Sequence, residues 1–230
     1  MIKNVDSTEG GGAHWLIYDN KRSTSNPRDI RLYSNLSQAE AQNAKYNLDF
    51  FSNGFQITSF SSNFGYNNSG ETYIFMAFAQ DPDTTPATKA DSFEAKAYTG
   101  DGNAKEIDLS NGMKPDMIWI KTRNQSNDHN LVDSIRGTSK YVRSNRDIAE
   151  VTQSDGVTSF DNNGFTVGTG GDFGGSNNYI AWAWKAADHD RGLATINQDG
   201  SVTSLVSANQ AAGFSIVKYN GNGTNGATVG

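Results

Sequence analysis

Short apolar runs separated by turn residues follow one another along the whole chain. Residues 55–58 and 165–167 alternate apolar with polar side chains, and each run follows an Asn-Gly pair, the strongest short signal for a β-hairpin. Residues 73–79 and 179–184 are apolar on both faces, which is the pattern of a strand buried between two layers. The pattern therefore predicts many short strands, some half-exposed and others central.

The run at residues 179–184 gives the clearest prediction of a central strand. Ile180, Trp182 and Trp184 lie on one face of the strand, and small side chains dominate the other face. Large side chains on one side and small ones on the other suit a strand between two packed layers. We therefore assign both tryptophans to a core.

Helix signals are scarce. Residues 37–40 form a capping box and two alanines continue it, so one or two helical turns are expected there. Residues 145–150 carry a similar but shorter pattern. Because strands do not alternate with helices, the predicted fold class is all-β with little helix, built as tandem antiparallel β-sandwiches of jelly-roll or concanavalin-like topology.

The chain carries the same marker residues twice, in the same order. Glu40 precedes Gly54 by 14 residues, and Glu150 precedes Gly164 by 14 residues. The remaining markers, first copy against second, are Asp19 and Arg22 with Asp133 and Arg136, Ser34-Asn35 with Ser144-Asn145, Phe55 with Phe165, and Tyr73-Ile74 with Tyr179-Ile180. Such self-similarity indicates tandem domains.

A third, partial copy gives the period of the repeat. Residues 98–103 resemble residues 219–224, which lie 121 residues further on, and a period of this length is that of a globular domain. Residues 1–3 align with residues 119–121, so the first copy lacks a counterpart of residues 98–116. We expect the chain to be a piece of a longer tandem array.

Four segments follow from this register. We expect an N-terminally truncated β-sandwich repeat at residues 1–80, a linker at 81–92, a complete β-sandwich repeat at 93–190, and the truncated start of a third repeat at 191–230. The linker holds two of the four prolines in the chain, and proline interrupts regular secondary structure.

Composition narrows the function classes. The net charge of −6 repels a phosphate backbone, so nucleic acid is not an expected partner. The chain has no cysteine, which excludes a disulfide framework and a thiolate zinc site. The longest apolar run is far shorter than the roughly 20 residues of a membrane span, so we expect no membrane insertion.

No arrangement of residues indicates catalysis, and we expect no enzyme activity, no cofactor and no metal. Residues 221–226 match a dinucleotide-binding fingerprint, but no βαβ unit surrounds them, so we interpret them as a turn. Glu40 or Glu150 could pair with Asp49 or Asp133, but nothing indicates the cleft that the acid pair of a glycosidase must flank. The histidines lack metal-ligand spacing and are interpreted as loop residues: His14, His129 and His189.

Two sets of residues remain as binding candidates. Loop aromatics can stack on the apolar face of a sugar, and this chain has four in its loops between apolar strands: Phe60, Phe64, Tyr66 and Phe173. The alternative is that these rings pack into local clusters. The pairs Asp19/Arg22 and Asp133/Arg136 either grip a carboxylate or a sugar, or form strand-end ion pairs that position the next loop. We take them as structural markers of the repeat.

Several of these segments resemble a known repeated domain. They are residues 114–121, 133–137, 158–168 and 178–186 in the second copy, and 15–22, 32–33, 52–55 and 73–79 in the first. That domain has no assigned function and is common in tail-fibre-like and other virion-associated proteins of marine bacteriophages. The resemblance implies a virion or adhesion context, with the extracellular particle as location, and implies no catalytic residues.

The expected function is a non-enzymatic structural or adhesion module of a phage tail fibre or related virion protein, whose loops bind a host-surface glycan or protein. The expected partners are other virion or fibre subunits, as in a homotrimer, and shallow contacts would gain affinity through multivalency. One alternative is a carbohydrate-binding domain of a secreted glycan-active enzyme. Another is a glycan depolymerase, which would need an acid pair that the sequence does not offer.

Overall fold

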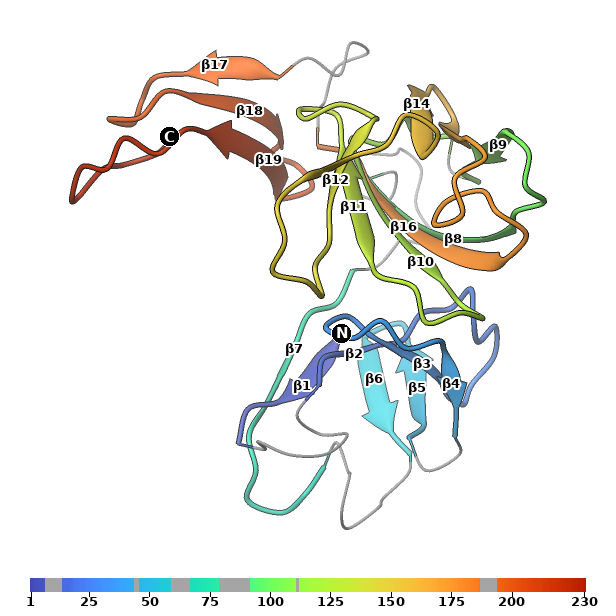
Figure 1. Cartoon of the computed structure of the whole chain (residues 1–230). Helices are drawn as coiled ribbons and strands as arrows, with labels where there is room; N and C mark the ends of the chain where they lie inside the picture. The colour runs from blue at the N-terminus through green and yellow to red at the C-terminus, as the bar shows by residue number, and fades with distance from the viewer. Residues whose placement is uncertain (7–13, 44–45, 59–66, 79–91, 111, 187–193) are drawn as a thin grey trace.

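The computed structural model describes residues 1–6, 14–43, 46–58, 67–78, 92–110, 112–186 and 194–230. Within these residues the chain forms β-strands and no α-helix (Figure 1). No helix in this part of the chain could therefore cross a membrane. The strands pair antiparallel into several sheets, and the predicted all-β, sandwich-like fold is confirmed.

The second unit comprises strands β8 to β16. Its large sheet has the order β13-β12-β11-β10-β16-β8, with bounds Val151–Thr152, Lys140–Val142, Asn130–Asp133, Met117–Thr122, Asn178–Trp184 and Phe93–Thr99. Its small sheet has the order β14-β15-β9, with bounds Val157–Asp161, Gly164–Val167 and Lys105–Asp108. The apolar core between the two sheets includes Tyr98, Ile107 and Phe165.

The first unit comprises strands β1 to β7. Its large sheet has the order β4-β3-β2-β1-β7, with bounds Ala41–Gln42, Ile30–Tyr33, Leu16–Ile17, Ile2–Asn4 and Tyr73–Phe75. A hairpin of β5 and β6 faces this sheet, with bounds Leu48–Phe51 and Gly54–Ile57. The core of this unit is smaller and includes Ile2, Leu16 and Leu48.

The two large sheets have the same strand order. The order β4-β3-β2-β1-β7 corresponds to β13-β12-β11-β10-β16, and the hairpin β5-β6 corresponds to β14-β15. The second unit has two further strands, β8 beside β16 and β9 beside β15. Both come from the stretch that has no counterpart in the first copy of the repeat. In the described part of the first unit, β7 and β6 are consequently outer strands.

A third apolar cluster, here called the junction cluster, joins the two units. Ile17 and Leu32 of the first unit pack against Ile180, Trp182 and Trp184 of the second. These side chains point away from the core of their own unit, because their neighbours along each strand point into it. The two large sheets are therefore stacked face to face, with the smaller sheets on the outside.

Strand β16 lies at the centre of this arrangement, between β10 and β8. Ile180, Trp182 and Trp184 face the junction cluster, whereas Tyr179 and the alanines between them face the core of the second unit. These side chains are at most 7% exposed. The prediction of a central strand with both tryptophans in a core is confirmed for residues 179–184. The same prediction for residues 73–79 is wrong, because β7 covers only Tyr73–Phe75, is the last strand of its sheet in the described part of the chain, and leaves Phe75 60% exposed.

The predicted helix after the capping box is wrong. Residues 37–40 have no regular structure, and β4 begins directly after them. The Glu40 carboxylate accepts hydrogen bonds of 2.8 and 3.0 Å from Arg123, and the Glu40 amide donates to the Arg123 carbonyl at 2.7 Å. These contacts between the units engage both groups that a capping box would use, so tertiary structure overrides the local signal.

The C-terminal sheet has the order β17-β18-β19, with bounds Thr195–Asn197, Ser204–Asn209 and Phe214–Tyr219. It projects to one side of the second unit, and its free end lies away from the first unit (Figure 1). Phe214 stacks on Trp184 at 6.0 Å, and the Asn209 amide donates to Ser92 Oγ at 3.1 Å. These contacts attach one end of the sheet to the second unit.

Candidate functional site

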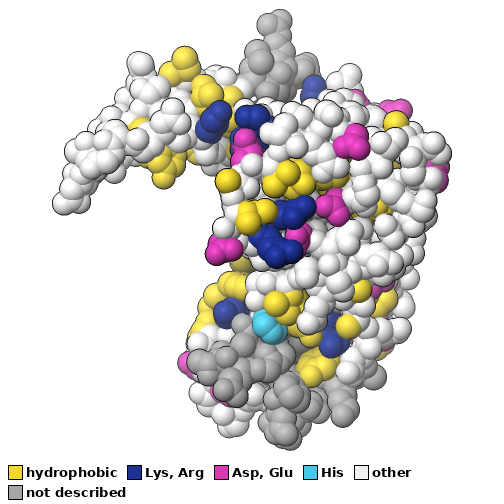
Figure 2. All heavy atoms as spheres, viewed as in Figure 1, with side chains coloured by type: hydrophobic (Ala, Val, Ile, Leu, Met, Phe, Trp, Pro, Cys, Tyr) yellow, Lys and Arg dark blue, Asp and Glu magenta, His cyan; other side chains and the backbone are white. Residues whose placement is uncertain are grey.

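An apolar groove runs along the open side of the first unit and into its junction with the second unit. Its volume is about 1180 Å³. Aromatic side chains make up much of its lining: Tyr18, Phe50, Phe51, Phe55, Phe75, Phe78, Phe93, Trp119, Trp182, Trp184 and Phe214. Apolar side chains gather where the lower and upper parts of the molecule meet (Figure 2). We call this space the edge groove.

Beside β6, the edge groove extends over the position that strand β9 occupies in the second unit. There, a Cβ on Gly164 would lie 2.1 Å from the Ile107 carbonyl oxygen. No atom of the described residues lies within 4 Å of a Cβ on the corresponding Gly54. Likewise Phe165 is fully buried opposite Ile107, whereas Phe55 is only partly buried. The part of the groove beside Gly54 and Phe55 is therefore the space that β9 fills in the second unit.

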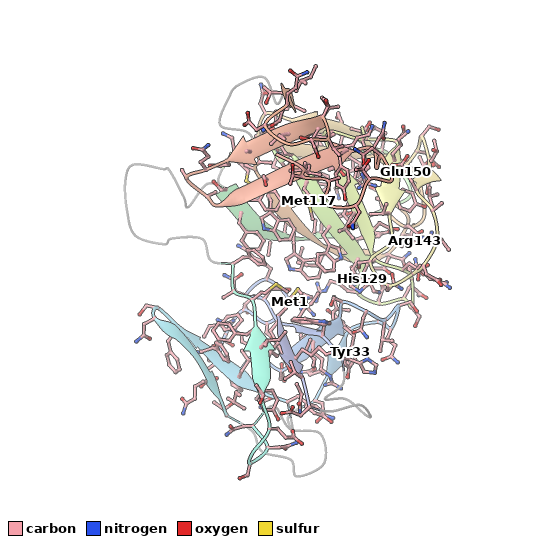
Figure 3. All side chains as sticks on the ribbon, turned by 90° about the vertical axis from the view of Figure 1, so that its left-hand side faces the viewer. Met1, Tyr33, Met117, His129, Arg143 and Glu150 are labelled. Atoms are coloured by element: carbon pink, nitrogen blue, oxygen red, sulfur yellow. The ribbon has the colours of Figure 1, made fainter. Side chains whose placement is uncertain are left out.

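His129 is a buried polar link between the two units. Its Nδ1 accepts a hydrogen bond of 2.8 Å from Trp119 Nε1, and its Nε2 lies 2.8 Å from the carbonyl oxygen of Tyr33. Because an indole nitrogen can only donate, the neutral ring carries its proton on Nε2 and donates it to Tyr33. His129 lies at the boundary of the two units, above Tyr33 (Figure 3).

The environment of His129 keeps its ring neutral. Burial, together with the nearby Lys121 charge, lowers the pKa of His129 to about 4, against weaker opposing effects from its hydrogen bonds and from Asp128. Both ring nitrogens are engaged, so the side chain is not free to bind a metal or to transfer a proton. His129 precedes β11, as the loop interpretation expected, but its role is in the junction.

The two Asp/Arg pairs have the same geometry. In the first, Asp19 accepts hydrogen bonds from the Arg22 amide and from Arg22 Nε at 2.8 and 2.6 Å, and Arg22 Nη2 donates to the Ile17 carbonyl at 2.9 Å. In the second, the corresponding distances between Asp133 and Arg136 are 2.8 and 2.5 Å. Each carboxylate thus closes the turn after β2 or β11, and each arginine holds the strand that precedes it.

The first pair is the more deeply buried. The Arg22 side chain is 0% exposed and lies 5.9 Å from the Trp182 ring, whereas the Arg136 side chain is 18% exposed. Burial raises the pKa of Asp19, but the Arg22 charge and the hydrogen bonds outweigh it and hold that pKa below its usual range. Neither carboxylate is left to grip an external ligand.

The Arg22→Lys change is expected to lower the free energy of unfolding by about 1–2 kcal/mol, because lysine lacks the planar fork that bonds Asp19 and Ile17 together. Arg136→Lys, the matched change at the more exposed pair, is expected to cost less than about 1 kcal/mol. Urea denaturation of the two variants measures both values. Equal losses would contradict the stronger role assigned to the buried pair.

The four loop aromatics do not form a site in the described part of the chain. Phe60, Phe64 and Tyr66 lie outside the described residues. Phe173 is 1% exposed, its ring packs edge-to-face on Tyr141 at 5.3 Å, and it belongs to the core of the second unit. The interpretation of Phe173 as a ligand-binding ring is therefore corrected: a buried ring cannot stack on a sugar.

The two glutamates considered as members of an acid pair are engaged in ion pairs. Glu40 bonds Arg123 at the junction, and Glu150 contacts Lys140 at 3.1 Å and Arg136 at 3.6 Å. Glu40 thus lies at the boundary of the two units, whereas the ion pairs of Glu150 are with Lys140 and Arg136 of the second unit. The described residues contain no group of three or more histidines and carboxylates that could hold a metal ion.

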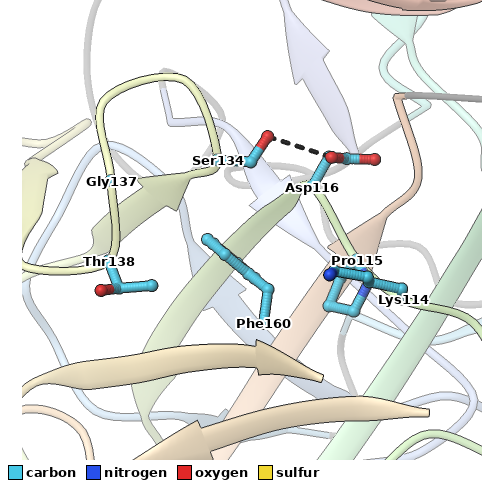
Figure 4. A pocket seen from close by; sticks show the side chains of 7 residues that line it. All are labelled: Lys114, Pro115, Asp116, Ser134, Gly137, Thr138 and Phe160. Atoms are coloured by element: carbon cyan, nitrogen blue, oxygen red, sulfur yellow. Dashed lines mark hydrogen bonds between the residues drawn. The ribbon is translucent and has the colours of Figure 1, made fainter. Parts of the chain in front are cut away.

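A second, smaller pocket of about 210 Å³ lies in the second unit between Lys114, Asp116, Ser134 and Phe160 (Figure 4). The Asp116 carboxylate accepts hydrogen bonds from Ser134 Oγ at 3.0 Å and from the Ala186 amide at 2.9 Å. Both of its oxygens therefore bind the ends of neighbouring strands together. The polar groups of this pocket thus have a structural role, and the edge groove remains the stronger candidate site.

Sequence reasoning missed the groove residues Phe51, Phe75 and Phe78, which are 53%, 60% and 50% exposed. Their exposure follows from the absence of a counterpart to β8 and β9 beside them. The alignment of the two copies already contained that signal, because it showed that the first copy lacks this stretch.

A family model described as Domain of unknown function (DUF7483) matches residues 1–82 and 88–230. No curated protein and no solved structure matches the chain.

Proposed function

We propose a structural and adhesive role for this chain, which belongs to the family described as Domain of unknown function (DUF7483). In this proposal, the chain is a rigid, non-enzymatic segment of an extended assembly, as in a phage tail fibre or a related virion protein. Its partners are other subunits of that assembly and a host-surface glycan or protein.

The observation that carries the structural part of the proposal is the junction cluster. Tandem domains joined by a linker alone move relative to one another, whereas a large apolar interface restrains them. Here two aromatic side chains of β16 pack on Ile17 and Leu32, and the buried His129 adds a hydrogen bond to Tyr33. Repeated units that share an apolar cluster in this way suit a segment that transmits mechanical force along an assembly.

The virion context rests on the resemblance of the repeated motifs to domains of tail-fibre-like proteins. Immunogold electron microscopy, with an antibody against this chain, is the direct test. We expect label on extracellular virus particles from cultures that produce the protein. Label confined to cells or to secreted soluble protein would overturn the virion assignment.

A carbohydrate-binding domain is the second candidate, and the exposed rings of the edge groove favour it. Aromatic rings at a groove can stack on the apolar faces of sugars. A glycan array with the intact chain and two variants separates the candidates. Loss of about tenfold in affinity for Phe51→Ala, with Ile196→Ala unchanged, would favour carbohydrate binding in the groove. Ile196 is a suitable control because it is 69% exposed on β17, outside the groove.

A further inference from the structure

The outer edge of β7 differs from the corresponding edge of β16. Strand β8 covers β16 along this edge over seven residues. β7 is the last strand of its sheet in the described part of the chain, and its residues Ile74 and Phe75, with the following Met76, are 45%, 60% and 43% exposed. The corresponding side chains of β16 are at most 4% exposed. An exposed apolar edge of this kind is a template for another strand.

Strand β19 resembles in sequence β8, the strand that covers the corresponding edge of β16 in the second unit. It repeats β8, with Phe214 in the place of Phe93 and Tyr219 in the place of Tyr98, and a Gly-x-Gly turn follows both tyrosines closely. Among the described strands, β19 pairs only with β18, and its Val217 and Tyr219 are 42% and 55% exposed. β19 is therefore a strand of the β8 type with an open edge.

We propose that β19 of one copy of this chain pairs antiparallel with the outer edge of β7 in a second copy, as β8 pairs with β16 within one chain. The β8–β16 register, transferred through the repeat, gives these opposite residues: Phe214 and Phe78, Ile216 and Met76, Lys218 and Ile74. The added strand covers the exposed residues of β7 and borders the edge groove. This mode of recognition is strand addition, in which main-chain hydrogen bonds supply affinity and alternate side chains supply register.

The partner strand comes from another copy because the chain's own β19 is held elsewhere. Phe214 stacks on Trp184, and the Asn209 amide donates to Ser92 Oγ and to the Lys185 carbonyl. These contacts attach the C-terminal sheet to the second unit, where its strands lie apart from β7 (Figure 1). Only Phe214, at the start of β19, comes near the first unit, because it and Phe78 pack on the same Trp184 ring in the described part of the chain. Each copy thus offers an acceptor edge and a donor strand at different places, and such contacts generate head-to-tail association. The inference rests on the duplicated strand order and stands independently of any adhesive or virion role.

Cysteine cross-linking tests both the partner and the register, since the chain has no cysteine of its own. The Ile74→Cys and Lys218→Cys variants of the 230-residue chain are mixed and oxidised. Directly opposite residues of paired strands lie close enough for a disulfide. We expect a disulfide-linked dimer of two 24.9 kDa chains from this mixture. The control mixture of Ile74→Cys with Thr195→Cys, an exposed residue of β17, should remain monomeric.

Three outcomes of this experiment would overturn the proposal. They are no cross-link in the first mixture, equal cross-linking in the control, and a linked dimer from either variant alone, which would indicate symmetric pairing of two β7 or two β19 edges. A variant that carries both cysteines in one 230-residue chain adds a fourth outcome. An intramolecular disulfide without a ladder of larger species would show that β19 pairs with β7 of its own chain.

Sedimentation equilibrium tests the same contact without cysteines. The mass of the unmodified chain is expected to rise above 24.9 kDa as concentration increases from micromolar to millimolar. Ile74→Lys places a cation opposite Lys218, and like charges directly opposite destabilise strand pairs, so association should weaken about tenfold. Combining it with Lys218→Glu should restore association. A constant mass for the unmodified chain, or no restoration in the double variant, would overturn the proposal.

Discussion

The Phe165→Ala variant is expected to lose about 3–5 kcal/mol of unfolding free energy, because removing a fully buried phenylalanine leaves a cavity in a packed core. Phe165 is 0% exposed, lies opposite Ile107 of β9 and packs edge-to-face on Tyr98 at 6.1 Å. Urea or guanidinium denaturation followed by far-ultraviolet circular dichroism measures the loss.

The matched change is Phe55→Ala, at the corresponding position of the first unit. Phe55 is only partly buried and packs on Phe75 at 5.2 Å, with the edge groove beside it. We expect a loss of about 1–2 kcal/mol, because less apolar surface is withdrawn from water. The same residue type in the same local motif thus has different costs, and the difference measures the contribution of β9 to the second core.

Equal losses in dilute solution would contradict an open first unit. A loss for Phe55→Ala that grows with protein concentration would have a separate meaning. It would indicate that a second copy covers the groove, because binding to the folded state adds stability by mass action.

The duplicated pattern predicted the fold well where residues face a core. The Asn-Gly pairs predicted both hairpins, and the alternation of large and small side chains placed β16 between two layers. These signals are local, since a strand's two faces and a hairpin's turn are set by neighbouring residues. The alignment of the two copies also shows that the given residues of the first copy hold no counterpart of β8 and β9.

Contacts between residues that are distant in sequence could not be predicted in this way. Glu40 carries a valid capping signal, yet Arg123, distant in sequence, binds its carboxylate. Phe173 stands in a glycine-rich loop, yet the loop folds back so that its ring enters the core. A local sequence pattern holds no information on which distant cation or cavity will lie nearby. From the sequence, Glu40 therefore has only its capping signal and Phe173 only its position in a loop.

Stability is expected to fall as pH drops from about 6.5 to about 4, and His129 is the expected cause. The pKa of this histidine is about 4 in the folded chain against an ordinary 6.5. Between these values the unfolded chain binds a proton that the folded chain does not, so lowering the pH favours unfolding. The contribution is fully present above pH 6.5 and amounts to about 3 kcal/mol, which is lost by the time the folded pKa is reached.

Protonation also breaks a specific contact of the junction. His129 Nδ1 accepts the Trp119 indole hydrogen, and a protonated ring would direct a second donor at it. His129→Gln keeps a donor for the Tyr33 carbonyl but has no group that titrates in this range. Thermal unfolding of both proteins across pH 4–7 gives the comparison. We expect a smaller decrease for the variant, by about 3 kcal/mol when converted to unfolding free energy, together with lower stability at pH 7. Parallel pH profiles for the two proteins would show that carboxylates elsewhere, and not the buried histidine, control acid unfolding.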